Sequence, residues 1–176
     1  MSGVPGAAVG QVKVSPFAAV NVAPGAKVTH DGITFTWPDV QSGQPDNIIA
    51  LGQTILISGT GAKLGFLGAS TSATVSGDGM VSYTDGSTST FTVTIDNYFN
   101  PPGAENDAVA TMAYLNDSNP ASNGGTAGKR VQTVYVFYAK VPIVPGRTVR
   151  AVTLPPNGSA PSGRNYGMHI FALGIG

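Results

Sequence analysis

At 176 residues the chain is long enough to bury a hydrophobic core, and its 24 glycines and 13 prolines favour turns over helix interiors. Only 10% of the residues are charged, against roughly 25% in ordinary globular domains, and nine basic residues balance nine acidic ones. This composition lacks the basic surface that nucleic acid or an anionic membrane requires, so we expect neither as a partner. The absence of cysteine excludes disulfides and thiol chemistry.

The N-terminal residues are predicted to lie outside the folded core. Residues 1–11 are predicted to be a tail or linker, and residues 12–176 a single domain whose first strand is Val12–Phe17. The opening MSGVPGAAVG lacks the charged and apolar regions of a signal peptide. If the protein is exported, its signal would lie upstream of this chain.

The stretch from Val28 to Ser70 predicts four short strands, after a preceding strand at Lys27–Thr29. Ile33, Phe35 and Trp37 alternate with threonines, the period of a half-buried strand. The pair Asp31-Gly32 predicts a hairpin turn before it, because glycine adopts the positive φ of such turns. Further strands are predicted, each bounded by turn residues, at Asn47–Leu51, Gln53–Ile57 and Lys63–Leu67.

The second half of the chain continues the same pattern. Tight turns are predicted at Asp78-Gly79 and Asp85-Gly86. Strands are predicted at Ala73–Ser76, Met80–Tyr83, Phe91–Ile95, Ala108–Tyr114, Val131–Val141, Thr148–Leu154 and Met168–Ile175. Residues Asp96–Asp107 are predicted to form a loop, and Asn116–Gly128 an exposed, mobile loop. The apolar positions of Val131–Val141 do not alternate, which indicates a strand covered on both sides or a bulge.

Eleven or twelve strands at a spacing of roughly 8–12 residues predict an all-β fold, a single antiparallel β-sandwich of jelly-roll type. The inner faces are predicted from the alternating apolar positions. They are Ile33, Phe35, Ile55, Ile57, Leu64, Phe66, Phe91, Val93, Ile95, Val134, Val136, Val149, Val152, Ile170 and Ala172.

Catalytic motifs are absent from the sequence: there is no HExxH, GxSxG, Walker loop or GxGxxG. Of the two histidines, His169 is predicted to be a strand residue that hydrogen-bonds a neighbour, and His30 to be solvated. The nine carboxylates lie in or beside predicted turns, where Asx turns are the ordinary structural role. We therefore expect the chain not to be an enzyme. A small hydrolase using loop carboxylates remains an alternative.

The loop Asp96–Asp107 carries two candidate sites. Oxygens of Asp96, Asn97, Asn106 and Asp107 bracket it and are a calcium alternative, although no known calcium-loop spacing is present. No other cofactor is predicted. For a neutral sugar, Tyr98 offers an apolar face, and Asp96, Asn97 and Asn116 offer hydrogen bonds, with Tyr114 behind them. These five residues are the predicted carbohydrate site.

Several runs follow one another in a characteristic order, among them PGAKVTHDGITFTWPDV, PDNIIALGQTI, LGFLGAST, VSYTDGSTSTFTVTIDNYF, TVYVFYAKVPI and MHIFALGIG. Over about Val20 to Ile175 the chain resembles a non-catalytic β-sandwich module appended to large secreted bacterial enzymes of actinobacterial type, including glycoside hydrolases, peptidases and phospholipases. Two positions depart from that pattern. Val12–Ala19 only partly matches the Gly- and Asp-rich first strand, and Tyr98-Phe99 stands where paired tryptophans are frequent.

The resemblance implies a secreted accessory module that binds carbohydrate or cell-surface polysaccharide weakly, with the ligand or a host enzyme domain as partner. A structural or assembly module that packs against a host domain or another copy is the alternative. The low charge favours that alternative too, because edge strands without Lys or Glu lack protection against pairing.

Overall fold

A computed structural model of the chain describes residues 23–41, 44–71, 73–103, 106–117, 128–157 and 167–176. The strands are β1 (Lys27–His30), β2 (Ile33–Thr36), β3 (Ile48–Ile49), β4 (Thr54–Thr60), β5 (Lys63–Thr71), β6 (Val75–Tyr83), β7 (Thr88–Ile95), β8 (Asp107–Met112), β9 (Leu115–Asp117), β10 (Gly128–Arg130), β11 (Val134–Pro142), β12 (Thr148–Thr153) and β13 (Gly167–Ile175). The described residues include no helix long and apolar enough to cross a membrane.

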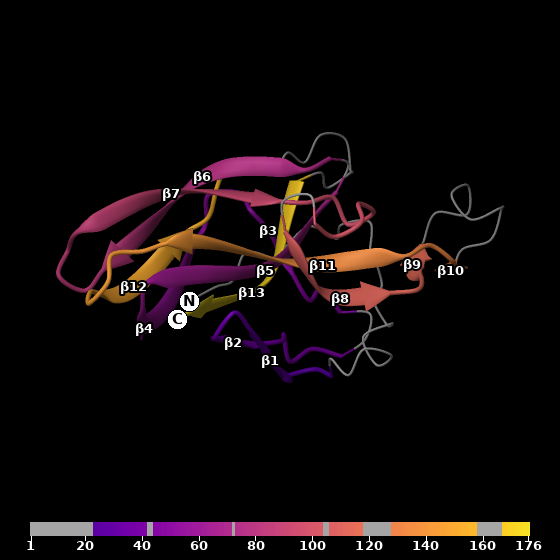
Figure 1. The fold of residues 1–176 in the computed structure, drawn as a ribbon, viewed down its shortest axis with the longest axis horizontal. Coiled ribbons are helices and arrows are strands. Elements are labelled where there is room, and N and C mark those ends of the chain that lie inside the picture. The colour runs from indigo at the N-terminus through magenta and orange to yellow at the C-terminus, as the bar shows by residue number, and fades with distance from the viewer. Residues whose placement is uncertain (1–22, 42–43, 72, 104–105, 118–127, 158–166) are drawn as a thin grey trace.

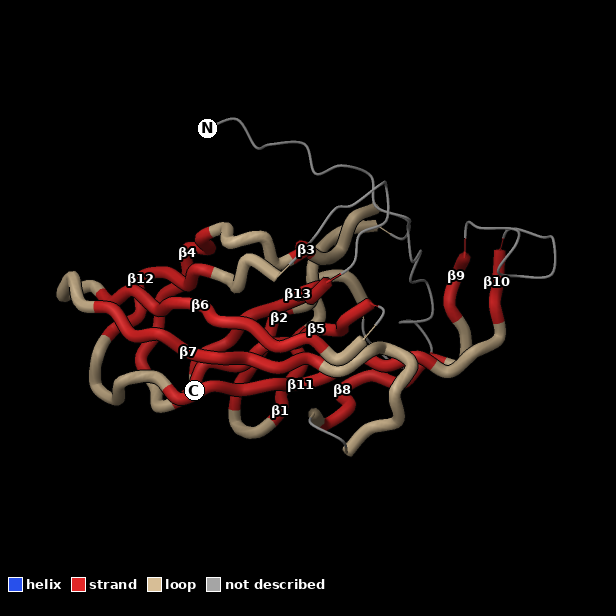
Figure 2. Tube along the Cα trace, turned by 90° about the horizontal axis from the view of Figure 1, so that it is seen from above, coloured by secondary structure: helices blue, strands red, loops and turns tan. Residues whose placement is uncertain are grey.

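Two antiparallel sheets form the body of the molecule. One has the strand order β3-β13-β5-β11-β8 and the other β4-β12-β6-β7, and the hairpins β1-β2 and β9-β10 are separate two-stranded sheets. The hairpin β9-β10 projects from one end of the sandwich in both views (Figures 1 and 2). The predicted all-β sandwich is confirmed.

The main core lies between the two sheets. It includes Phe66 of β5, Phe91 of β7 and Val149 of β12, all nearly or fully buried, and the Phe66 and Phe91 rings meet with centroids 5.6 Å apart. Strand β7 shows the predicted alternation, with Phe91, Val93 and Ile95 buried and Thr92 exposed. Burying side chains of this kind contributes roughly 1.5–3 kcal/mol each.

A second core covers the opposite face of the five-stranded sheet, and the single set of inner faces predicted from the sequence did not distinguish it. The β1-β2 hairpin lies there (Figure 1), with Ile33, Phe35 and Trp37 buried against that face. Gly65 and Gly174 make room for it, since a Cβ on Gly65 would lie 2.7 Å from the Phe35 ring and one on Gly174 2.4 Å from Ile33. Because the sheet is covered on both faces, the burial of β5 is nearly continuous.

The turn predicted at Asp78-Gly79 is wrong, because both residues lie inside the nine-residue strand β6. Gly79 serves close packing instead of chain reversal: a Cβ there would lie 2.3 Å from the Phe91 ring. By contrast, the turns at Asp31-Gly32 and Asp85-Gly86 are confirmed, and Asp31 and Gly32 have the positive φ values of 47° and 73° that such hairpins need.

Other boundaries also differ from the prediction. Asn116 and Gly128 belong to strands β9 and β10 instead of a loop, and the described residues hold thirteen strands. Strand β11 begins at Val134, so Val131 is 81% exposed, and the suspected bulge occurs between Val136 and Phe137. The strand predicted at Val12–Phe17 and the boundary after residue 11 lie outside the described residues.

Candidate functional site

The loop after β7 is closed by reciprocal hydrogen bonds between two buried residues, Asp96 and Asn106. The Asp96 N–H donates to Asn106 Oδ1 at 2.8 Å, and the Asn106 N–H donates to Asp96 Oδ2 at 3.1 Å. Thr74 Oγ1 donates to Asp96 Oδ1 at 2.9 Å, and Asn106 Nδ2 donates to the Thr94 carbonyl. With 0% of Asp96 exposed, its carboxylate holds the loop and does not face a ligand.

Asn97 is also buried and serves the local backbone. Its side-chain oxygen accepts from the Phe99 N–H at 2.9 Å, an Asx turn of the kind expected for such residues. Both backbone polar groups of the neighbouring Tyr98 are hydrogen-bonded. Its N–H donates to the Ser70 carbonyl, and its carbonyl accepts from the Tyr135 N–H, each at 3.0 Å. The backbone of this segment is therefore joined to β5 and β11.

Tyr98 and Phe99 form a half-buried aromatic pair on this rigid segment. Their ring centroids are 4.0 Å apart, and the Arg130 guanidinium lies over the Phe99 ring at 5.4 Å. Both rings pack against the second core on one side, and each keeps part of its surface exposed. Tyr98 is thus a partly exposed aromatic ring on a fixed backbone.

The other two predicted sugar ligands, Tyr114 and Asn116, lie after β8. Tyr114 is partly buried directly before β9, and Asn116 lies in β9 opposite Lys129 of β10. The structure therefore brings Asp96, Asn97 and Tyr98 together through the chain itself, and places Asn116 on the projecting hairpin.

The four predicted calcium ligands do not gather around one point. Asp96 and Asn106 bond each other, Asn97 bonds the Phe99 N–H, and the Asp107 carboxylate faces His30, with 3.4 Å between Oδ2 and Nε2. Among the described residues, no three acidic or histidine side chains cluster to hold a metal ion.

A charged cluster beneath the β1-β2 turn escaped the sequence analysis. Asp31 Oδ2 accepts from Lys63 Nζ and Lys140 Nζ at 2.8 Å and from the Tyr138 hydroxyl at 3.0 Å. The hydrogen bond from Lys140, then that from Lys63, holds the Asp31 pKa well below its usual range, while burial and the Asp31 carboxylate raise the Tyr138 pKa. His30, expected to be solvated, keeps 29% of its side chain exposed, and its ring lies 4.5 Å from that of Tyr138.

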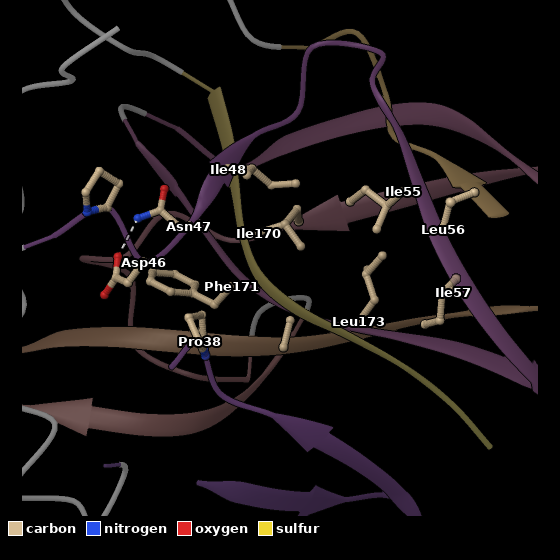
Figure 3. A pocket seen from close by; sticks show the side chains of 12 residues that line it. Pro38, Asp46, Asn47, Ile48, Ile55, Leu56, Ile57, Ile170, Phe171 and Leu173 are labelled. Atoms are coloured by element: carbon tan, nitrogen blue, oxygen red, sulfur yellow. Dashed lines mark hydrogen bonds between the residues drawn. The ribbon is translucent and has the colours of Figure 1, made fainter. Parts of the chain in front are cut away.

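An open groove of about 440 Å³ lies between the edges of the two sheets (Figure 3), and the sequence analysis did not find it. Its walls come from β4 and β13. One end is polar: Asn47 Nδ2 donates to Asp46 Oδ1, and His169 Nδ1 lies 2.8 Å from Asn47 Oδ1. The His169 contact is the strand-histidine hydrogen bond expected from the sequence. Burial raises the pKa of Asp46 above its ordinary value.

A comparison with known families identifies the β-sandwich as a whole. The model of a family described as the AziU2-like beta-sandwich domain matches residues 10–173. A comparison with curated proteins gives no match.

Proposed function

We propose that this chain, which belongs to the AziU2-like β-sandwich domain family, is a non-catalytic module that binds neutral carbohydrate weakly and accompanies a secreted enzyme. One observation carries the proposal: Tyr98 and Phe99, partly exposed and with ring centroids 4.0 Å apart, lie on a segment fixed by buried hydrogen bonds. A rigid aromatic face loses little conformational freedom when a sugar ring packs on it.

The structure changes the roles that we assign to the predicted site residues. Asp96 and Asn97 position the aromatic pair, because their polar atoms already bond the protein. Polar contacts with a sugar would come from the Tyr98 hydroxyl, from Asn100 and from Arg130, which are partly exposed. One aromatic face and a few solvent-exposed hydrogen bonds support affinities in the micromolar to millimolar range, roughly 4–8 kcal/mol.

The test is a titration of the full chain with soluble glucan, mannan and xylan, followed by NMR. Tyr98→Ala should abolish binding of whichever glycan binds the parent. Phe171→Ala is the matched control, because Phe171 is also a partly exposed aromatic but belongs to β13. Binding that survives Tyr98→Ala, or that is lost equally in the control, would remove this site. Affinity should change little between low and high salt, since no ion pair with the ligand is involved.

The non-catalytic part of the proposal has its own test. The chain should give no turnover with a panel of chromogenic glycosides and esters. Turnover that disappears on Asp107→Ala would instead support the hydrolase alternative, because the Asp107 side chain is 74% exposed and accessible to substrate.

Strand β4 favours a second candidate function, assembly with a host domain or another copy. It forms one edge of its sheet, its sequence TILISGT contains no charge or proline, and Leu56 on it is 80% exposed. Uncharged edges pair readily with other strands. Size-exclusion chromatography over a concentration series distinguishes the two: a stable oligomer without glycan affinity would favour assembly.

A further inference from the structure

The groove between the sheets exists because β3 is short. Strand β3 pairs only with His169 and Ile170 of β13, and β4 forms the facing edge of the other sheet. Between these edges, Ile55 and Ile57 of β4 face Ile170 and Leu173 of β13 (Figure 3). At about 3.3 Å per residue, the stretch from Ile170 to Leu173 gives an apolar wall of roughly 10 Å.

The polar end of this groove carries a carboxylate, Asp46, that has no cationic partner among the described residues. Asp46 is partly buried, and no Lys, Arg or His of the described residues forms a salt bridge with it. Among the described residues that line the groove, no other side chain is charged. Burial, the largest influence on Asp46, raises its pKa, and Asn47 only partly offsets this. The charge of this carboxylate is therefore poorly compensated when ionised.

His169 and Asn47 keep the carboxylate end in one arrangement. The His169 ring, with Nδ1 2.8 Å from Asn47 Oδ1, fixes which way the Asn47 amide faces, so that Nδ2 donates to Asp46 Oδ1. His169 is 91% buried within β13, so the orientation is built into the sheet. His169 and Asn47 are positioning residues for Asp46.

We propose that this groove binds a primary alkylamine, with the ammonium group on the Asp46 carboxylate and the hydrocarbon chain extending past Phe171 toward Ile170 and Leu173 (Figure 3). Charge complementarity decides the head group. An ammonium donates charge-assisted hydrogen bonds to a carboxylate, whereas a fatty-acid carboxylate would be repelled. The isoleucine and leucine walls favour a chain over a sugar, because sugar hydroxyls placed there would lose their hydrogen bonds to water.

This site goes beyond the proposed carbohydrate function and lies on different elements, so each can fail alone. The experiment titrates the full chain with n-hexylamine, n-hexanol and hexanoate, followed by NMR shifts of β4 and β13. We expect hexylamine to bind about tenfold more tightly than hexanol, since a hydrogen bond to a charged group exceeds a neutral one by about that factor. Hexanoate should bind more weakly than either.

Two matched variants make the test specific. Asp46→Asn should reduce hexylamine affinity to that of hexanol and leave hexanol binding unchanged. Asp39→Asn, which removes an exposed carboxylate next to Pro38 at the same end of the groove, should leave the amine preference intact. Tyr98→Ala should change nothing. The proposal is overturned if no hexyl ligand shifts these strands, if amine and alcohol bind equally, or if Asp39→Asn removes the preference as fully as Asp46→Asn.

Discussion

Replacing Asn106 by Ala tests whether the reciprocal hydrogen bonds between Asp96 and Asn106, here called the clip, hold the loop after β7. The substitution removes the side-chain oxygen that accepts from the Asp96 N–H at 2.8 Å and the amide that donates to the Thr94 carbonyl at 3.1 Å. Two backbone groups then lose their partners, one of them fully buried. An unsatisfied buried group costs about 1–3 kcal/mol, so we expect a loss of about 2–4 kcal/mol in the free energy of unfolding.

Urea denaturation measures this loss as a lower midpoint with an unchanged slope. Asn100→Ala is the control, because its amide donates to Thr74 Oγ1 at 3.4 Å in an exposed position, and its effect should stay within about 0.5 kcal/mol. If Asn106→Ala is no more destabilising than Asn100→Ala, the clip does not stabilise the fold. Glycan affinity should also fall in Asn106→Ala, although Asn106 is buried, because Tyr98 would lose its fixed position.

Three further predictions concern the core and the groove. Gly79→Ala places a methyl group 2.3 Å from the Phe91 ring and 2.7 Å from the Thr153 carbonyl, and should lower stability in urea by about 1–3 kcal/mol, whereas a surface turn would tolerate it. Phe35→Ala and Phe91→Ala should each lower it by about 3–5 kcal/mol, and tolerance of both would mean that the assigned cores are wrong. Asp46→Asn should raise stability at neutral pH and have no effect below the usual range of aspartate. Because the folded pKa of Asp46 lies above the ordinary 3.8, the folded parent binds more protons between these two values and loses stability as pH rises through that window. Thermal melts at acidic and neutral pH show whether the difference between parent and variant grows in that direction.

The sequence predicts well those features of the fold that depend only on residues close together in the chain. The alternation of Ile33, Phe35 and Trp37 and the turn Asp31-Gly32 depend on neighbours along the chain, and the structure confirms both. Asp78-Gly79 has the same composition as a hairpin turn, yet it lies within β6. What decides its conformation is the Phe91 ring from β7, a contact between strands that a dipeptide pattern does not contain.

The two cores show the same limit of prediction from local sequence patterns. Periodicity assigns Ile33 and Phe66 to buried faces, and both are fully buried. It does not say that they lie on opposite sides of the five-stranded sheet, because that depends on where the β1-β2 hairpin docks. Gly65 and Gly174 provide the space for it and are far from it in the sequence.

The candidate sites depend still more on contacts between distant residues. The sequence locates the aromatic pair Tyr98-Phe99, but the direction of the Asp96 side chain depends on Thr74 and Asn106. The groove escapes sequence reasoning altogether, since its walls come from β4 and β13, and its polar end joins Asn47 to His169. The local sequence around the groove shows only an aspartate followed by a short apolar run, PDNIIA. Aspartates in ordinary turns have the same neighbours, so this pattern does not predict a groove.

Asp46 differs from the other aspartates whose surroundings the structure describes in detail. Two lysines compensate Asp31, Arg147 and Ser87 compensate Asp85, and backbone and threonine donors satisfy Asp96. Asp46 is instead partly buried with a raised pKa, so stability alone favours an asparagine, whose oxygen would still accept from Asn47. A residue that weakens the fold at neutral pH is expected where a ligand requires it, since binding sites hold groups with perturbed pKa values. The effects of Asp46→Asn on stability and on amine binding together show whether Asp46 is kept for a ligand. A variant that is more stable and no longer prefers hexylamine identifies the carboxylate as a binding group, whereas a more stable variant with unchanged amine binding identifies it as a local defect of the fold.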